Sequence, residues 1–99
     1  MPREVIISTR AKLEIIDAEL WWFENREKAP NAFREELEAA LTLLTERPEI
    51  GTVIRTRQRS PRTHRLTLRR VNYYLYYRVE QDSIIVTSLW HTSRRPPRL

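Results

Sequence analysis

The feature that most constrains the fold is a change of hydrophobic period near Gly51, the only glycine in this chain of 99 residues. Before it, apolar residues recur every three or four positions, which is the period of an amphipathic helix. In most of the sequence after it, apolar and polar residues alternate, which is the period of a strand. A helical first half followed by an extended second half predicts an α+β domain, with helices covering one face of an antiparallel sheet.

The first helix is expected to carry two apolar stripes. Residues 4–8 are rich in β-branched side chains and predict a buried strand, after which Ser8 or Thr9 can cap a helix over residues 10–25. The stripes lie on nearly opposite sides of that helix, one with Ala11, Ile15, Ala18 and Trp22 and the other with Leu13, Ile16, Leu20 and Phe23. One stripe suffices for a surface helix, so two predict either a helix packed between two layers or a face kept for a partner.

A second helix follows a polar turn at residues 25–28. Pro30 suits its first turn, and Pro48 and Gly51 end it. Its apolar face consists of Phe33, Leu37, Ala40, Leu41 and Leu44. Two helices of similar length joined by a short turn predict an antiparallel helix hairpin.

The remaining residues predict three strands. Residues 64–68, 72–80 and 83–92 carry the strand signals, and residues 52–57 alternate only weakly. Residues 72–80 and 83–92 are spaced as a hairpin. The expected order is an N-terminal strand, a helix hairpin and a three-stranded antiparallel meander, in one domain over residues 1–99, because a chain of this length has no room for a second core.

Composition excludes several classes of protein. The chain has no cysteine, which rules out a disulfide framework and thiolate zinc sites. It lacks the run of about 18 apolar residues that a membrane helix needs, and its N-terminus is too short and too charged for a signal peptide, so we expect a cytoplasmic protein. His64 and His91 are 27 positions apart with no carboxylate at a matching spacing, so we expect no metal or other cofactor.

Charge is distributed unevenly along the chain. Residues 1–54 hold 7 basic and 11 acidic side chains, a net charge of −4, whereas residues 55–99 hold 11 basic and 2 acidic ones, a net charge of +9. Of the 18 basic residues 16 are arginine, whose planar guanidinium suits phosphate, carboxylate and stacking contacts. The second half is therefore expected to meet an anionic partner, either nucleic acid or an acidic protein, unless its charge serves solubility alone.

The densest basic segment is residues 55–70, with seven arginines and no acidic residue. In an extended chain Arg55, Arg57 and Arg59 share a face, because side chains alternate with period two. Such a row suits phosphates or an acidic peptide. The segment could equally be a basic loop with no binding role. The sequence leaves all three interpretations open: phosphate binding, peptide binding and a loop without a partner.

Four tyrosines mark the strand over residues 72–80. Tyr73 and Tyr77 alternate onto the face expected to form the core. Tyr74 and Tyr76 share the opposite face with Arg78 and are the candidates for stacking on nucleic acid bases. The glycine-containing aromatic signature of RNA-recognition modules is absent, which argues against that module.

His91 is the candidate general base, since an unperturbed histidine titrates near neutral pH. It ends the last expected strand, where its side chain can reach a partner. The alternative is a polar strand end that only bonds a neighbouring residue. The carboxylates at residues 35–38 lie on the polar side of a helix and indicate a solvated face rather than a catalytic pair.

Four strings in order resemble the RelE/ParE superfamily of bacterial toxin–antitoxin toxins. They are VIISTRAKLEIID at residues 5–17, RPEIG at residues 47–51, HRLTLRRVNYYLYYRV at residues 64–79 and SLWHTSRRPPRL at residues 88–99. The resemblance covers nearly the whole chain. It implies the strand, helix hairpin and antiparallel meander described above.

The superfamily divides by function. RelE-like members are ribosome-dependent endoribonucleases that use lysines, arginines and a C-terminal tyrosine or histidine, whereas ParE-like members inhibit DNA gyrase without being enzymes. The long helix hairpin and the absence of lysine after Lys28 favour the ParE-like branch. So does the closing motif formed by Trp90, His91, Arg94 and Pro96. We expect a ParDE-type plasmid-stabilisation or chromosomal toxin with no catalytic residue, the alternative being a ribonuclease that uses His91.

The resemblance also implies two partners. DNA gyrase is the expected target, with nucleic acid touched only indirectly, and the expected contact residues are Arg65, Arg78, His91, Arg94, Arg95 and Arg98. A cognate antitoxin is expected to wrap the chain with a segment that folds on binding. Its expected contact residues are Trp21, Trp22, Arg55, Arg57 and Arg59. No membrane partner is expected.

Overall fold

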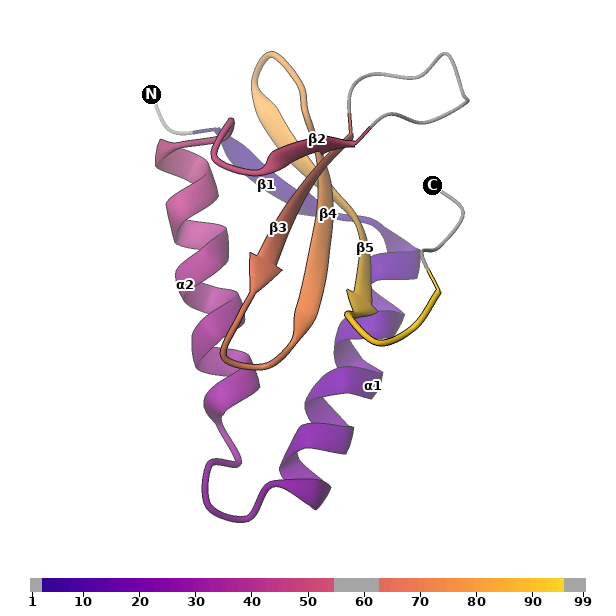
Figure 1. Ribbon diagram of the computed structural model, residues 1–99. Coiled ribbons are helices and arrows are strands. Elements are labelled where there is room, and N and C mark those ends of the chain that lie inside the picture. Colours follow the sequence, from indigo (N-terminus) through magenta and orange to yellow (C-terminus); the bar gives the residue numbers. More distant parts are fainter. Residues whose placement is uncertain (1–2, 55–62, 96–99) are drawn as a thin grey trace.

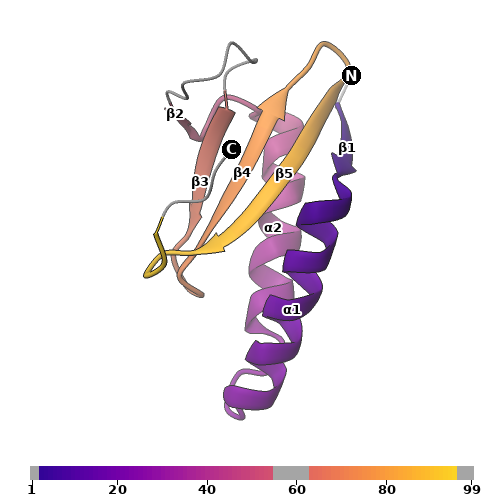
Figure 2. The ribbon, with the colours of Figure 1, turned by 90° about the vertical axis from the view of Figure 1, so that its right-hand side faces the viewer.

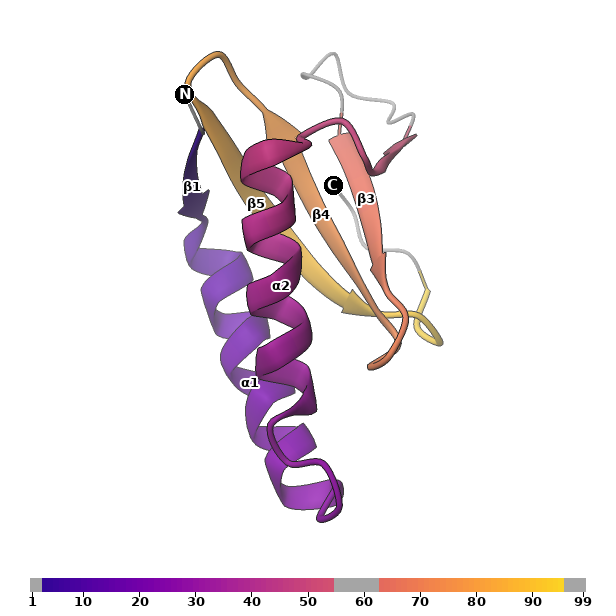
Figure 3. The ribbon, with the colours of Figure 1, turned by 90° about the vertical axis from the view of Figure 1, so that its left-hand side faces the viewer.

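The computed structural model describes residues 3–54 and 63–95 and confirms the α+β fold (Figure 1). Its elements are β1 (Glu4–Ile7), α1 (Thr9–Asn25), α2 (Ala32–Glu46), β2 (Thr52–Ile54), β3 (Thr63–Leu68), β4 (Tyr73–Val79) and β5 (Ser83–His91). The two helices form a hairpin against one face of the sheet (Figure 3).

The sheet has two features that the sequence did not predict. Its strand order is β1-β5-β4-β3-β2, and β1 runs parallel to β5, so the sheet is mixed rather than antiparallel. Residues Thr52–Ile54 add a fourth strand to the meander by pairing with β3. Alternation of side chains reveals that a segment is extended but carries no information on the direction of its neighbour, which is why the parallel pair was missed.

The ends of both helices follow from their capping residues. Ser8 caps α1 as expected, because its Oγ accepts a hydrogen bond from the Ala11 N–H at 3.1 Å. The N-cap of α2 is Asn31, so Pro30 precedes the helix instead of occupying its first turn. The proline still ends the connection between the helices, where its fixed φ suits a turn.

The hydrophobic core lies between the helix hairpin and the sheet. Its largest fully buried side chains include Phe33 and Leu44 from α2 and Leu75 and Tyr77 from β4. The Phe33 ring meets Tyr73 edge-on, with centroids 5.3 Å apart. Each such side chain contributes roughly 1.5–3 kcal/mol by leaving water.

Gly51 is required by a close approach. Its N–H donates a hydrogen bond to the Tyr77 hydroxyl at 2.9 Å. A Cβ at this position would lie 2.5 Å from the same hydroxyl oxygen and 3.0 Å from the Arg65 carbonyl oxygen, so no side chain fits. The Tyr77 ring also stacks on the buried His64, with centroids 5.1 Å apart and planes 20° apart. The turn after α2 is thereby fixed to the centre of the sheet.

A register shift in β5 decides which way its last residues point. Tyr77 pairs with Val86 and Tyr76 pairs with Ser88, so Thr87 is an extra residue in β5. A bulge of this kind changes the alternation of the strand. Leu89 therefore joins the core and His91 lines a pocket against α1. Without the bulge, simple alternation from Val86 would have turned both away from the helices.

Candidate functional site

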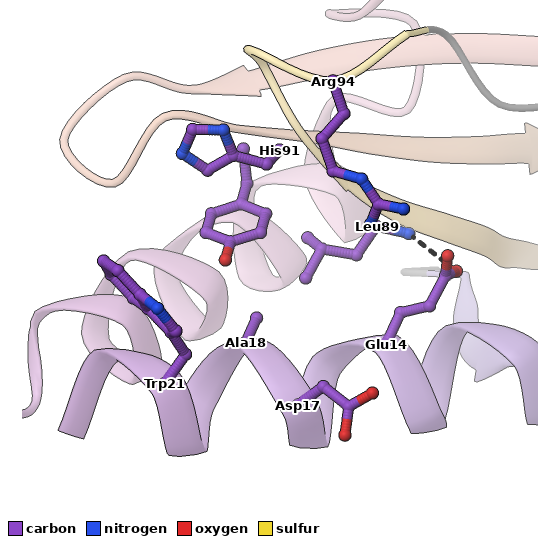
Figure 4. Close-up of a pocket in the computed structure, with 8 residues that line it drawn as sticks. Glu14, Asp17, Ala18, Trp21, Leu89, His91 and Arg94 are labelled. Atoms are coloured by element: carbon purple, nitrogen blue, oxygen red, sulfur yellow. Dashed lines mark hydrogen bonds between the residues drawn. The ribbon is translucent and has the colours of Figure 1, made fainter. Parts of the chain in front are cut away.

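The end of β5 and the middle of α1 enclose a pocket of about 200 Å³ (Figure 4). It is lined by Glu14, Asp17, Ala18 and Trp21 from α1, and by Tyr73, Leu89, His91 and Arg94 from the sheet and the segment after it. Figure 2 shows β1 beside β5 at the edge of the sheet, with α1 continuing from the end of β1. The pocket holds two carboxylates, one guanidinium and one imidazole, and is the polar cleft nearest the expected target-binding tail.

Glu14 joins the helix to the bulge of β5. Its Oε1 accepts hydrogen bonds from the Ser88 hydroxyl at 3.0 Å and from the Leu89 N–H at 3.3 Å, and it lies 3.6 Å from the Arg10 Nε. A bulge leaves backbone groups without ladder partners, and this carboxylate satisfies one of them. Glu14 is therefore a positioning group for β5.

His91 is held by the turn that follows it. Its Nδ1 accepts the Ser93 N–H at 3.2 Å and lies 2.7 Å from the Ser93 hydroxyl oxygen, and its ring meets Tyr73 edge-on at 5.1 Å. An Nδ1 that accepts a backbone N–H places the proton of the neutral ring on Nε2, as inferred from this network. The lone pair that a general base would use is then already engaged.

Arg94 is ordered by an aromatic partner. Its guanidinium carbon lies 3.9 Å from the centroid of the Trp90 ring, and the Trp90 indole N–H donates to the Arg95 carbonyl oxygen. Within residues 3–54 and 63–95, neither Arg94 nor Arg95 takes part in an ion pair. Burial raises the pKa of the Tyr73 hydroxyl, and the nearby Arg94 charge opposes part of that rise. Arg94 is thus held over Trp90 by a cation–π contact.

Arg65 and Arg78 lie on the sheet face opposite the helices. Arg65 stacks over Tyr74 at 4.3 Å, and Arg78 lies 4.0 Å from Glu80. The Arg78 Nε is buried without a hydrogen-bond partner. These two arginines do not share a pocket with His91, so the expected target residues fall into two groups. Arg98 lies outside the described residues.

Tyr76 is not available for base stacking as expected, because it is only 2% exposed. Its neighbours across the strands are Arg65 and Ser88, and the Tyr74 ring lies 6.2 Å away on the same strand. A residue in the middle of a central strand is covered by such neighbours even on the open face. Of this pair, Tyr74 is the more accessible and stacks with Arg65 instead.

The residues expected to contact the antitoxin differ in their exposure. Trp22 is a core residue, 9% exposed, and its indole N–H donates to the Ala29 carbonyl oxygen at 2.7 Å, so it offers no surface to a partner. It lies on the α1 stripe that faces the sheet. Trp21 is 44% exposed and is stacked by Arg26 at 5.0 Å. Arg55, Arg57 and Arg59 lie outside the described residues.

Sequence reasoning missed the acidic wall of the pocket. Glu14 and Asp17 lie between the two apolar stripes of α1, three residues apart on one flank. That spacing was visible, but nothing in the sequence indicated that β5 would pack beside this flank. Among the described residues no group of three or more histidine, aspartate or glutamate side chains could hold a metal ion. Among the same residues, no helix has the length and apolar content to span a membrane.

Three solved structures with a similar fold come from toxin–antitoxin systems. The chromosomal ParDE toxin–antitoxin system from P. aeruginosa has a chain with a TM-score of 0.71 at 15% identity, covering 92% of this chain and 97% of that one. A chain of the intact E. coli RelBE toxin–antitoxin complex has a TM-score of 0.63 at 24% identity, covering 93% of this chain and 99% of that one. A chain of the archaeal RelE–RelB complex from Pyrococcus horikoshii OT3 has a TM-score of 0.59 at 20% identity, covering 96% of this chain and 100% of that one. The chain shares its fold with these three structures.

The family follows from the sequence match. Residues 5–96 match the family described as the ParE toxin of the type II toxin–antitoxin system, parDE. The chain belongs to this family. None of the curated proteins compared with the chain matches it.

Proposed function

We propose that the chain inhibits DNA gyrase in the cytoplasm and is neutralised by a cognate antitoxin of a ParDE-type module. The observation that carries this proposal is the match of residues 5–96 to the ParE toxin family. No cofactor is needed, because the inhibitor acts by binding and trapping a cleaved-DNA state of its target.

The surroundings of His91 support a non-enzymatic mechanism. Its Nδ1 is engaged by Ser93, and the carboxylates of Glu14 and Asp17 line the same pocket. A ribonuclease must hold the scissile phosphate in the pocket of its base, and the two carboxylates that line this pocket would oppose the attraction of Arg94 for that phosphate. The pocket therefore suits a protein side chain better than an RNA phosphate.

The arginines after β5 are the best target contacts. Arg94 is already ordered over Trp90, so less side-chain entropy is lost when it meets an acidic group. Arg95 follows directly and is exposed. Arg65, Arg78 and Arg98 remain proposed contacts, with Arg65 and Arg78 on the other face of the sheet.

Supercoiling and DNA-cleavage assays with purified gyrase test this proposal. The wild-type chain is expected to block supercoiling and to accumulate cleaved DNA. Arg94→Glu and Arg95→Glu should each weaken inhibition at least tenfold, whereas Arg69→Glu, an exposed charge on the turn after β3, should change it less than threefold. If all three variants lose inhibition equally, Arg94 and Arg95 are not part of the surface that contacts gyrase.

One observation favours the alternative of a ribosome-dependent ribonuclease: His91 lines one pocket with Tyr73 and Arg94, which are a phenol and a cation of the kind used in acid–base chemistry. Under this alternative, His91→Ala should abolish mRNA cleavage on ribosomes while the variant still binds its antitoxin. A wild-type chain that stops cell-free translation and has no effect on gyrase would establish the alternative and exclude gyrase as target.

A further inference from the structure

Two arginines are stacked on aromatic rings of neighbouring strands. The Arg65 guanidinium carbon lies 4.3 Å from the centroid of the Tyr74 ring, and that of Arg94 lies 3.9 Å from the centroid of the Trp90 ring. Tyr74 on β4 and Trp90 on β5 are cross-strand partners. Side chains at such positions share a face, with their Cβ atoms about 5 Å apart. These four residues, called here the arginine–aromatic row, therefore run as one surface from β3 across β4 to the segment after β5.

The row connects the two groups of arginines expected at the target. Arg65 lies at one end, on the sheet face opposite the helices, and Arg94 lies at the other end, where it also lines the pocket beside α1. Within residues 3–54 and 63–95, no ion pair joins either arginine to a carboxylate. Arg34, by contrast, lies 2.7 Å from Glu19. The row therefore carries two positive charges that anionic groups of a partner can neutralise.

Each ring orients its arginine without using up the hydrogen-bond donors of the guanidinium. A guanidinium stacked over a ring makes contact through its face, and the N–H groups at its edge remain available for a carboxylate. Trp90 adds a second restraint, because its indole N–H donates to the Arg95 carbonyl oxygen. The intervening turn is also anchored, since the Thr92 N–H donates to the Asn72 carbonyl oxygen at 2.9 Å. Less side-chain entropy is therefore lost when the stacked arginines bind a partner.

The covered rings favour a protein partner over nucleic acid. Base stacking needs an accessible aromatic ring, but both rings of the row are covered by its own arginines, and Tyr76 is only 2% exposed. A nucleic acid also presents a phosphate at every nucleotide, and two carboxylates line the pocket at the Arg94 end of the row. A protein can place separate carboxylates at the two arginines without meeting that repulsion.

We propose that gyrase binds the arginine–aromatic row, with one carboxylate of the target held by Arg65 and another by Arg94, and with Tyr74 and Trp90 as positioning residues. This inference rests on the proposed inhibition of gyrase. It adds the chemical groups that the target supplies and two aromatic residues that act through the arginines. The surface expected on the target is acidic and spans neighbouring strands of this sheet.

Substitution of the two rings tests their positioning role in the supercoiling assay. Trp90→Leu and Tyr74→Leu should each weaken inhibition about three- to twentyfold, the size of a cation–π contact. Trp90→Phe and Tyr74→Phe keep a ring and should recover most of that loss. The matched control is Phe23→Leu, which removes a ring that is 63% exposed on α1 and should change inhibition less than about twofold. Circular dichroism checks that each variant folds.

A double-mutant cycle tests whether Trp90 acts through Arg94. Because the ring positions the guanidinium, Trp90→Leu should weaken inhibition less than about threefold in an Arg94→Gln background. In the chain labelled with 5-fluorotryptophan, Arg94→Gln should also shift the Trp90 fluorine resonance and leave that of the buried Trp22 unchanged. Additive losses in the cycle would overturn the positioning role of Trp90.

Lysine substitutions test the carboxylates without removing a ring. Arg65→Lys and Arg94→Lys keep the charge but lose the planar fork that bonds a carboxylate through two N–H groups, so each should weaken inhibition at least about threefold. Arg69→Lys, on the exposed turn after β3, should have no effect. These variants keep a long basic side chain, so the test holds even if a leucine variant fails to fold. Inhibition equal to that of the wild type in both row variants would overturn the proposed recognition.

Purified gyrase and labelled oligonucleotides separate this inference from the proposed function. If the wild type inhibits gyrase and both leucine variants behave like Phe23→Leu, the row is wrong and the inhibition of gyrase stands. If the wild type leaves gyrase active but both leucine variants relieve growth arrest in cells, the row stands as the toxic surface and the gyrase target is wrong. If the chain alone binds single-stranded or duplex DNA at physiological salt and Tyr74→Leu abolishes that binding, the row is a nucleic-acid site and the proposal is overturned.

Discussion

The two apolar stripes of α1 look alike in the sequence and have opposite fates in the structure. The inner stripe, which faces the sheet, contains Ala11 and Ala18, and these are 0% and 5% exposed. The outer stripe, on the opposite side of α1, contains Leu13 and Ile16, and both are 60% exposed. Small residues let the helix approach the sheet closely, and bulky ones would hold it away. Hydrophobic period alone identifies a face. The two alanines mark where α1 lies close to the sheet, and the burial of Trp22 on the same stripe shows that side-chain size alone does not decide which face is buried.

The largest expected effect separates the two stripes directly. Ala11→Glu places a charge at a fully buried position and should destabilise the chain by at least about 3 kcal/mol. Leu13→Glu, two residues later on the outer stripe, should change the free energy of unfolding by no more than about 0.5 kcal/mol. Urea denaturation measures both. Similar losses would mean that the outer stripe is also packed.

A side chain added at Gly51 should also destabilise the chain. Gly51→Ala puts a methyl group 2.5 Å from the Tyr77 hydroxyl oxygen and should cost about 1–3 kcal/mol. Removing that hydroxyl with Tyr77→Phe should make the alanine less harmful, so a double-mutant cycle should give a coupling energy of about 1 kcal/mol. Additive losses would show that the clash lies with the Arg65 carbonyl instead.

Substitution of Glu14, on the flank of α1 between the two apolar stripes, should cause an intermediate loss of stability. Glu14→Ala removes the acceptor of the Leu89 N–H and the Ser88 hydroxyl and should destabilise the chain by about 1–2 kcal/mol. Asp17→Ala, three residues later on the same flank, should change stability by no more than about 0.5 kcal/mol. Thermal or urea unfolding distinguishes the two carboxylates, and equal effects would contradict the positioning role of Glu14.

The smallest expected effect concerns pH. Burial raises the pKa of the Tyr73 and Tyr77 hydroxyls above the ordinary value of 10.0. Below pH 10 both residues are neutral in the folded and unfolded chains, and their contribution to stability is complete. Above it the unfolded chain ionises first, so stability should fall as pH rises through that range. Urea midpoints measured from pH 8 to 11 should fall less steeply in Tyr73→Phe or Tyr77→Phe than in the wild type.

Much of the fold was predictable because it depends on local signals. The cap at Ser8, the two helices and the hairpin of β4 and β5 follow from side-chain period and turn spacing. The parallel pairing of β1 with β5 was not predictable, because direction is set by the path of the chain and not by alternation. The weak alternation at residues 52–57 likewise concealed β2.

The candidate site was less predictable, because it depends on one irregularity. The extra residue Thr87 turns Leu89 and His91 toward α1, and bulges leave no reliable trace in hydrophobic patterns. The sequence therefore singled out His91 as a candidate but not Glu14 and Asp17, which line the same pocket. Trp21 and Trp22 show the same limit, since adjacent residues on a helix point in different directions and only the tertiary structure buries one of them.

The central claim is that this ParE-family toxin acts on DNA gyrase and not on messenger RNA. The most direct measurement follows plasmid supercoiling and protein synthesis in the same cells during the first minutes after the chain is expressed without antitoxin. The account predicts that plasmids relax and accumulate breaks while amino acids are still incorporated at the normal rate. Protein synthesis that stops first, with plasmid supercoiling intact, would contradict it.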